Sequence, residues 1–408
     1  MKKQTIHFIR DQVNRINEAG LSLLLRNFLL FLITPFLLLI VLSVRFLRPL
    51  ILVRFGELIG RRIGHFASNT EIYLGERDLG IQNQRSTDVF YINGSVCNKQ
   101  LMKMWGRILC VSPFATGLDL INRALPGGSK HIVPWRKNQD RDIYGALEST
   151  KAHIAFTAKE ERIGRELLNK LGIKGEAGFV CFLSRDSSYL DAVFPKGKWH
   201  YHDYRDSDIK NFIPAAEELT RRGYFALRMG AVVKEKIETD NPMIIDYATK
   251  YRTDFLDIFL AAKCHFCLAD SCGFYCVPII FRRPVVIVNM IPLKYVPAWS
   301  LSYLFIPKKQ WLRKEHRLRT FREMLGSEIG DSKQYEQLGI EVINNTAEEI
   351  TAVAIEMDLR LKGKWQGDKV DEEMQQRFWS LFKPGEINRV FKSRIGAEFL
   401  RQNKELLK

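Results

Sequence analysis

The sequence predicts an α/β protein whose second half is built around a parallel sheet with helices on both faces. Between residues 176 and 370, short apolar runs of strand length alternate with longer segments whose apolar residues recur at helical spacing. Such alternation is typical of parallel sheets, because each strand is joined to the next by a crossover helix. With 408 residues and 46% hydrophobic content, the chain is long and apolar enough for two ordinary domains.

The segment before residue 176 predicts a smaller first domain over residues 51–175. A capping box of Thr157 and Glu160 starts a helix that runs through Leu171 and closes this domain. Strands are expected at Ile51–Phe55, Asp88–Ile92 and His131–Val133, and a helix at His65–Leu74.

The second domain, residues 176–370, has the clearest pattern. A second capping box, Thr346 with Glu349, begins its last helix. Residues 371–408 are expected to form further helices, whose aromatic side chains need a surface to cover. Strands are expected at Phe179–Leu183, Tyr224–Arg228, His265–Ala269, Val285–Asn289 and Ile340–Ile343, and helices at Pro214–Arg222, Phe255–Ala262 and Gly273–Ile280.

An uncharged apolar segment, Phe28–Val44, lies near the N-terminus between Arg26 and Arg45. Its 17 residues are at the short end for a spanning helix, and Pro35 lies near the middle. Both flanks are equally basic, so the positive-inside rule gives no orientation. We therefore expect residues 1–50 to associate with a membrane, either as a true span or as a helix embedded from one face, rather than to form a buried core helix.

The formal net charge of +16 favours anionic partners. No zinc-finger spacing, RNA-binding signature or basic zipper is recognisable, so nucleic acid is not an expected partner. The basic stretch Lys308–Arg322 is expected to be a solvated amphipathic face or a contact to a membrane or an anionic glycan. Seven cysteines, an odd number, and no recognisable signal peptide favour a reducing cytoplasm.

Polar residues follow three predicted strands of the second domain, at the carboxyl ends where open parallel sheets bind ligands. The Ser271 hydroxyl and the N–H groups of Cys272 and Gly273 could hold a diphosphate at a helix start, although Asp and Ser are also ordinary N-cap residues. Arg228 offers a fork of donors for phosphate or, equally, a salt bridge at a strand end. The clusters are Ser184, Arg185 and Asp186; Arg228, Met229 and Gly230; and Asp270, Ser271, Cys272 and Gly273.

Two residues of the helix after the first domain's glycine loop are candidates for a general base. His65 starts this helix and could face a cleft. Glu71 lies six residues further on, need not share that face, and is of a type more often solvated on helices. We therefore prefer His65 to Glu71 as the base.

Two patterns suggest metal sites, and neither is favoured. Asp206 and Asp208 form a D-x-D pair that could hold a divalent cation, but such short motifs often occur by chance and this one also fits a turn. Four cysteines lie between residues 264 and 276. Cys264 and Cys267 would point to opposite faces of a strand, so small core side chains are the better interpretation and no metal is expected.

Four segments of the chain resemble a family of bacterial glycosyltransferases linked to surface polysaccharides. They are Gly56–Tyr73 (GELIGRRIGHFASNTEIY), Phe182–Leu190 (FLSRDSSYL), Tyr204–Gly230 and Asp254–Asn289. The resemblance implies the GT-B architecture, in which two Rossmann-like domains face each other, here after the N-terminal hydrophobic membrane segment.

The resemblance also implies the partners and their sites. The second domain would bind a nucleotide-sugar donor, and the first would hold a glycan or lipid-linked acceptor. No metal or cofactor would be required besides the donor substrate, because positive groups can stabilise the leaving diphosphate. The expected location is the cytoplasmic face of the inner membrane. The donor would be bound by Arg228, Gly230, Asp270, Ser271 and Gly273, and the catalytic residues would be His65, Glu71, Arg185 and Asp186.

Two alternatives stay open at this point. One is a metal-dependent transferase of the single-domain type, built on Asp206 and Asp208. The other is a non-catalytic, membrane-bound protein that binds glycans or assists their assembly, since a fold alone does not establish catalysis.

Overall fold

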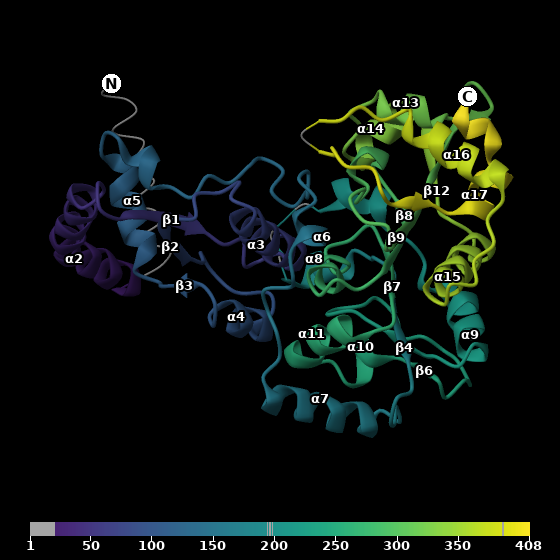
Figure 1. The fold of residues 1–408 in the computed structure, drawn as a ribbon, viewed down its shortest axis with the longest axis horizontal. Coiled ribbons are helices and arrows are strands. Elements are labelled where there is room, and N and C mark those ends of the chain that lie inside the picture. Colours follow the sequence, from purple (N-terminus) through teal and green to yellow (C-terminus); the bar gives the residue numbers. More distant parts are fainter. Residues whose placement is uncertain (1–20, 194, 196, 198, 386) are drawn as a thin grey trace. The chain divides into compact units, whose positions relative to one another are not determined.

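The computed structural model describes residues 21–408 except 194, 196, 198 and 386, with side chains from residue 33 onward. These residues form two units, each assembled from separate stretches of sequence (Figure 1). The smaller unit contains residues 21–58, 85–93 and 109–134, and the larger contains residues 59–84, 94–108 and 135–408.

The smaller unit is a short parallel sheet with helices. Its strands lie in the order β1-β2-β3, and Phe55 of β1 also pairs with Ile132. Arg54 and Asp88 stand opposite each other in the register of β1 and β2 and form a buried ion pair of 2.7 Å between Nε and Oδ1. The elements are α2 (Leu21–Phe46), β1 (Leu52–Glu57), β2 (Ser86–Tyr91), β3 (Cys110–Val111), α5 (Ala115–Ala124) and the 3-10 helix η1 (Gly128–His131).

Helix α2 contains most of the apolar segment predicted to meet a membrane; residues 1–20 of that prediction lie outside the described residues. One side of α2 packs on α5, where Leu37 and Val41 are buried and Arg45 donates to the Asn122 side chain. Other apolar side chains of α2 are exposed, Phe36 to 68% and Leu39 to 62%. In the described part of the chain, no helix combines the length and the apolar content needed to cross a bilayer.

The larger unit is organised around a seven-stranded sheet in which every neighbouring pair is parallel. The strand order is β13-β9-β8-β7-β4-β5-β6. In Figure 1, α9 and α15 lie on one face of this sheet and α11 lies on the other. The strands are β4 (Phe179–Leu183), β5 (Phe225–Arg228), β6 (Ile244–Ile245), β7 (Cys267–Asp270), β8 (Val285–Met290), β9 (Tyr303–Pro307) and β13 (Arg394–Ile395).

Helices from both halves of the chain belong to the larger unit. Those of the N-terminal half are α3 (Ile63–Asp78), α4 (Lys99–Trp105), α6 (Ala146–Ser149), α7 (Ala158–Lys170) and α8 (Ser188–Val193). The 3-10 helices are η2 (His200–Arg205), η3 (Ile209–Phe212), η4 (Leu293–Tyr295) and η5 (Lys404–Leu407). The remaining helices are α9 (Ile213–Arg221), α10 (Tyr247–Lys250), α11 (Asp254–Lys263), α12 (Cys276–Ile280), α13 (Phe321–Leu325), α14 (Ser332–Gln337), α15 (Ala347–Leu361), α16 (Lys369–Trp379) and α17 (Ala397–Gln402).

A small antiparallel sheet accompanies the large one in the same unit. Its strands are β10 (Lys309–Leu312), β11 (Arg317–Leu318) and β12 (Ile340–Ile343), in the order β11-β10-β12. The predicted strand at 340–343 is confirmed, but the expectation that it joins the parallel sheet is wrong, because it pairs antiparallel with β10. Both predicted capping boxes are confirmed, at the starts of α7 and α15.

The large sheet has a topological switch point between β4 and β7. From β4 the chain continues to β5 and β6 on one side, and it then returns to the other side of β4 to add β7, β8 and β9. Loops that leave the carboxyl ends of β4 and β7 therefore diverge and leave a crevice there.

Helix α3 is attached to the large sheet through its buried carboxylate Glu71. Oε1 of Glu71 accepts from His153 Nδ1 at 3.0 Å and pairs with Arg282 Nη2 at 2.8 Å. The second ring nitrogen of His153, Nε2, lies 3.0 Å from Asp78 Oδ2. Because both ring nitrogens face carboxylates, the protonated imidazolium fits this position best.

We predict that this cluster makes the stability of the larger unit depend on pH. Burial opposes protonation of His153, but Glu71 and Asp78 outweigh it and raise the pKa of the imidazole above its usual value of 6.5. A raised pKa in the folded state stabilises the fold fully below the unfolded pKa, and this stabilisation is lost as pH rises through the folded pKa. The free energy of unfolding should therefore decrease above about pH 6.5.

Denaturant unfolding at a series of pH values would test this prediction. The variant His153→Gln keeps a hydrogen-bonding side chain but does not titrate, so its stability should vary less with pH in the same window. Identical pH profiles of the two proteins would show that folding does not raise the pKa of His153.

Candidate functional site

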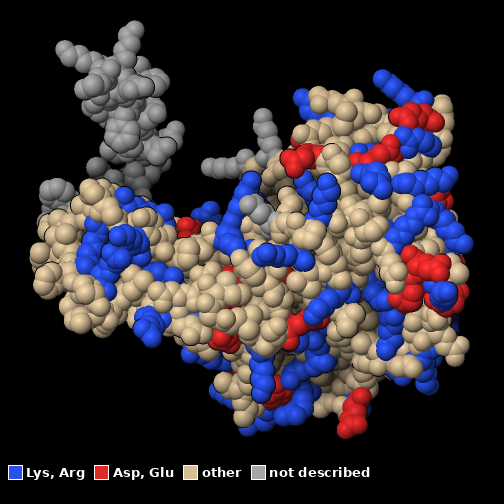
Figure 2. All heavy atoms as spheres, turned by 45° about the horizontal axis from the view of Figure 1, so that its top comes forward, with Lys and Arg blue, Asp and Glu red and all other residues tan. Residues whose placement is uncertain are grey.

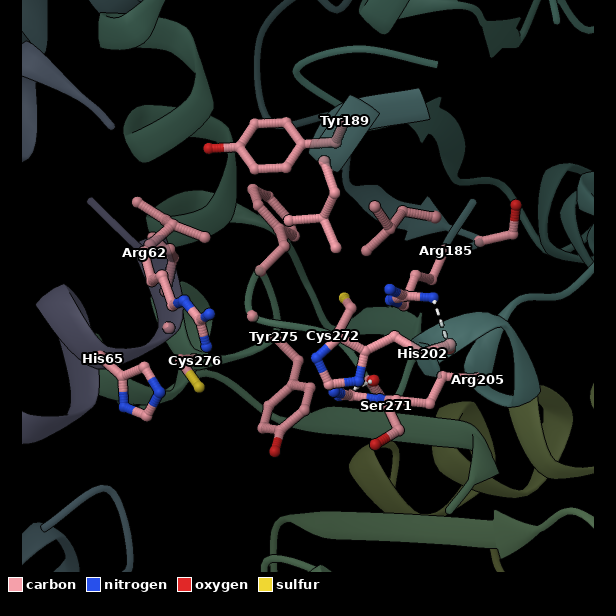
Figure 3. Close-up of a pocket in the computed structure, with 18 of the residues that line it drawn as sticks. Arg62, His65, Arg185, Tyr189, His202, Arg205, Ser271, Cys272, Tyr275 and Cys276 are labelled. Carbon is pink, nitrogen blue, oxygen red and sulfur yellow. Dashed lines mark hydrogen bonds between the residues drawn. The ribbon is translucent and has the colours of Figure 1, made fainter. Parts of the chain in front are cut away.

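A cavity of about 650 Å³ lies at the carboxyl ends of β4 and β7, within the larger unit (Figure 3). Its walls come mainly from the residues after β4 (183–190), the residues after β7 (271–277), the turn η2 (202–205) and the start of α3 (62–65). The cavity therefore occupies the crevice at the switch point of the sheet, which is where open α/β sheets bind ligands.

Basic side chains from separate segments converge on this cavity. Figure 3 shows Arg185, His202 and Arg205 on one side of it and Arg62 with His65 on the other. Among the described residues, Arg62 has no ion-pair partner. Such a concentration of positive charge is suited to an anionic ligand, and Arg in particular presents several donors to phosphate oxygens.

Arg185 is held in place at both ends. Its backbone N–H donates to Asp270 Oδ2 at 2.7 Å, and its guanidinium pairs with Asp206 and donates to the carbonyl of His202 at 3.3 Å. Burial, together with the charge of Arg205, lowers the pKa of the Arg185 guanidinium. A lowered pKa means that the surroundings disfavour this positive charge, so a bound anion would be stabilised there.

The turn η2 is fixed from below by Lys308, which is 2% exposed. Lys308 Nζ donates to the carbonyls of Tyr204 and Asp206 at 2.9 and 2.7 Å. Burial is the largest cause that lowers the pKa of this amine to about 8. The same turn carries Arg205, whose Nη2 donates to the Ser271 carbonyl at 2.6 Å. The buried Nε of Arg205 has no hydrogen-bond partner among the described residues.

Asp270 lies beneath the cavity and does not line it. Its carboxylate is fully buried and accepts from Arg185 N–H, from the Ser207 hydroxyl and from Asn289 Nδ2. Asp270, which we expected to contact a nucleotide-sugar donor, therefore does not reach the cavity. Instead it joins the ends of β4, β7 and β8.

The turn after β7 approaches the start of α3 very closely. A Cβ on Gly64 would lie 2.9 Å from Gly273 Cα, so only glycine allows the two backbones this contact. Ser271 and Gly273, two of the residues predicted to bind the donor, line the cavity. The N–H of Cys272, expected to be free for a phosphate, already donates to the Asp270 carbonyl at 2.7 Å, because residues 271–275 form turns and α12 begins only at Cys276.

Two predicted site residues lie away from the cavity. Arg228 is 2% exposed and pairs with Asp246 at 3.2 Å, so the alternative of a salt bridge at a strand end describes it. Arg228 and Ser271 do not follow neighbouring strands, because β4 lies between β5 and β7. Glu71 is fully buried in its contacts to His153 and Arg282.

The other predicted residues line the cavity. His65 lies at its edge with Nδ1 3.3 Å from Asn69 Oδ1. Asp186 accepts from the N–H groups of Ser188 and Lys234 and so shapes the loop after β4. Gly230 has φ +154, a left-handed conformation that favours glycine.

The D-x-D carboxylates are used separately in the structure. Asp206 pairs with Arg185, whereas Asp208 caps η3 by accepting from Lys210 N–H at 2.8 Å. Cys264 and Cys267 belong to the hydrophobic core of the sheet. Within the part of the chain that the structure describes, no three His, Cys, Asp or Glu side chains are grouped as metal ligands.

Sequence reasoning did not identify His202, Arg205 or Lys308 as site residues. His202 and Arg205 lie in a 3-10 turn, which has no periodic pattern. Two signals pointed to this turn: the adjacent D-x-D pair and, for Arg205, its place in the resembling segment Tyr204–Gly230.

The chain is similar to some solved structures but matches no known family. No family model matches the sequence, and no curated protein matches it significantly. A glycosyl transferase family 9 protein from Veillonella parvula has 13% identity and a TM-score of 0.42, over 63% of this chain and 86% of that chain. The E. coli ADP-heptose LPS heptosyltransferase II has 11% identity and a TM-score of 0.37, over 62% and 90%.

A third similar structure, assigned as a UDP-N-acetylglucosamine 2-epimerase from Listeria monocytogenes, has 9% identity and a TM-score of 0.27, over 58% of this chain and 79% of that chain. Glycosyltransferases are thus among the solved structures that the chain is similar to.

We predict that Arg228→Ala damages stability and not ligand binding. The change leaves Asp246 buried without its cation, which typically costs about 3–5 kcal/mol of unfolding free energy. Affinity of the folded protein for inorganic pyrophosphate should be unchanged, because Arg228 does not line the cavity. Denaturant unfolding and calorimetric titration of the same variant measure the two effects. Weaker pyrophosphate binding by a folded Arg228→Ala protein would contradict this assignment.

Proposed function

We propose that this protein is a glycosyltransferase that moves a sugar from a nucleotide-sugar donor to a glycan or lipid-linked acceptor in surface polysaccharide synthesis. The observation that carries the proposal is the convergence of Arg62, Arg185 and Arg205 on one cavity at the switch point of a parallel sheet. The cavity volume of about 650 Å³ is in the range of small-molecule sites.

The donor diphosphate is proposed to lie against Arg185, Arg205 and the Ser271 turn. In this position the guanidinium groups would bind the diphosphate and stabilise the negative charge that develops on it when the sugar leaves. Tyr189 and the residues 231–233 also line the cavity and offer less polar surface for the nucleoside. We propose that no metal is required, since fixed positive groups supply the same stabilisation.

His65 is the proposed base. It lies on α3 at the edge of the cavity opposite Arg185 and Arg205 (Figure 3). A contact between one ring nitrogen and Asn69 would orient the imidazole, and the other nitrogen would be free to take the proton of the attacking hydroxyl. Glu71 is not part of this proposal because its carboxylate is buried outside the cavity.

We further propose that the chain associates with a membrane surface through α2, at the cytoplasmic face of the inner membrane. Exposed apolar side chains of α2 support this, because hydrophobic surface at a protein exterior marks a contact site. Positive charge supports it as well: Figure 2 shows Lys and Arg outnumbering Asp and Glu over the visible face. All seven cysteines lie in the described residues and are free, which is consistent with a reducing compartment.

We predict that nucleoside diphosphates raise the thermal stability of the protein, because a ligand that binds the folded state shifts unfolding in proportion to its affinity. Arg185→Ala and Arg205→Ala should each weaken this binding at least about tenfold, the effect of one lost charge-assisted contact. Arg162→Ala is the matched control, since Arg162 is an exposed residue of α7 outside the cavity.

The measurement of thermal stability with nucleoside diphosphates is repeated in the presence of a chelator. Binding that is lost with chelator and restored by magnesium would favour the metal-dependent alternative at Asp206 and Asp208. Binding without turnover of any nucleotide sugar, with membrane extract as the source of acceptor, would favour the non-catalytic alternative. No nucleoside diphosphate binding at all would overturn the proposed donor site.

We predict that charges on the exposed side of α2 release the protein from membranes. Phe36→Asp with Leu39→Asp removes two apolar contacts of about 1.5–3 kcal/mol each. The fraction that sediments with membranes should therefore fall at least tenfold. Leu301→Asp with Leu338→Asp is the matched control, because both leucines are exposed residues of the larger unit. Continued sedimentation of the α2 variant after a high-salt wash would rule out α2 as the main anchor.

A further inference from the structure

His202 has no role in the donor or acceptor chemistry proposed above, yet it lines the same cavity. It belongs to the turn η2, and Figure 3 shows its ring next to Arg205 and Cys272. Its own carbonyl accepts from Arg185 Nη1 at 3.3 Å. The ring nitrogen Nδ1 is buried and has no hydrogen-bond partner among the described residues. An unpartnered buried ring nitrogen in a binding cavity leaves a hydrogen bond for a ligand to complete.

Charged groups reach His202 from several elements. Arg205 lies on the same turn, Arg185 follows β4 and Arg62 begins α3, and all three act against a positive imidazole. Asp203, also on the turn, acts in the opposite sense. Helix α14, which packs on the turn, contacts it through the Ser332 hydroxyl, which donates to the His200 carbonyl at 3.0 Å.

Cys272 and Asp331 complete the surroundings of this turn. Burial raises the pKa of the Cys272 thiol to about 11, so it is neutral at physiological pH. Asp331, at the start of α14, acts on the neighbouring Tyr204. Burial and the three guanidinium groups together lower the pKa of His202 to about 4. In the ligand-free protein at neutral pH, the imidazole is therefore neutral.

We propose that His202 takes up a proton when a diphosphate group enters the cavity, and that the imidazolium then donates a hydrogen bond to it beside Arg185 and Arg205. Each negative charge of the ligand offsets the guanidinium charges that disfavour the imidazolium, and a phosphate oxygen provides the missing acceptor. The proton comes from solvent, remains on a ring nitrogen while the anion is bound, and returns to solvent when the anion leaves.

This mechanism makes ligand affinity depend on pH with a definite sign. Binding takes up a proton between the pKa of the free protein, about 4, and the higher pKa of the complex. Affinity is therefore greatest at the low end of this window and falls as pH rises through the pKa of the complex. The inference rests on the proposed function only for the identity of the anion as part of a nucleotide sugar.

Calorimetric titration of the full-length protein with inorganic pyrophosphate tests the proposal. Repeating the titration in buffers of different ionisation enthalpy gives the number of protons taken up per ligand bound. Per ligand bound, the wild-type protein should take up more protons than His202→Gln, by up to about one. The ligand's own ionisation contributes equally to both proteins and cancels in this difference. His316→Gln, which alters an exposed histidine outside the cavity, is the matched control and should behave as wild type.

A second measurement requires no substitution in the protein that is titrated. In histidine-labelled wild-type protein, the ring C–H signal absent from His202→Gln identifies His202, and its pH titration should move to higher pH when pyrophosphate is added. An unchanged His202 titration in the pyrophosphate complex, or equal proton uptake by wild type and His202→Gln, would overturn the proposal while leaving the donor site intact. No pyrophosphate binding would overturn both, whereas proton-linked binding without sugar transfer would contradict only the proposed function.

Discussion

The cavity depends on one buried carboxylate, that of Asp270. Burying a carboxylate away from water is costly unless hydrogen bonds replace the lost hydration. Here the donors come from three separate places: the backbone after β4, the hydroxyl of Ser207 and the amide of Asn289. Asp270 therefore fixes the ends of three parallel strands and the segment after η2 relative to one another, and the positions of Arg185 and Arg205 follow from it.

Above this anchor the site holds more positive charge than its own carboxylates balance. The lowered pKa values of Arg185, His202 and Lys308 share two causes, burial and neighbouring guanidinium groups. An anionic ligand would reduce the repulsion between these positive groups. The ligand-free protein is therefore preorganised for an anion. The same arrangement is the basis for the proposal that a diphosphate is held here without a metal ion.

Much of the larger sheet could be predicted from sequence, because β4, β7 and β8 are uninterrupted apolar runs and the capping boxes are local. Strand β9 was missed. Lys308 was expected on a solvated face or at a membrane or glycan contact, because a basic stretch looks exposed until its buried contacts are known. Ser271 and Gly273 were found from their position after a strand. Arg228 was misplaced because sequence does not reveal that Asp246 lies within reach of the same strand end.

The two units are interleaved along the chain, which crosses between them after Leu58, Gln84, Asn93, Ile108 and Pro134. No single cut therefore yields either unit as a continuous fragment. The start of α3, which carries His65, and the turn after β7 lie more than 200 residues apart in sequence yet meet at Gly64 and Gly273. Contacts of such high sequence separation raise contact order, so we expect the ligand cavity to form late in folding, after the local elements that surround it.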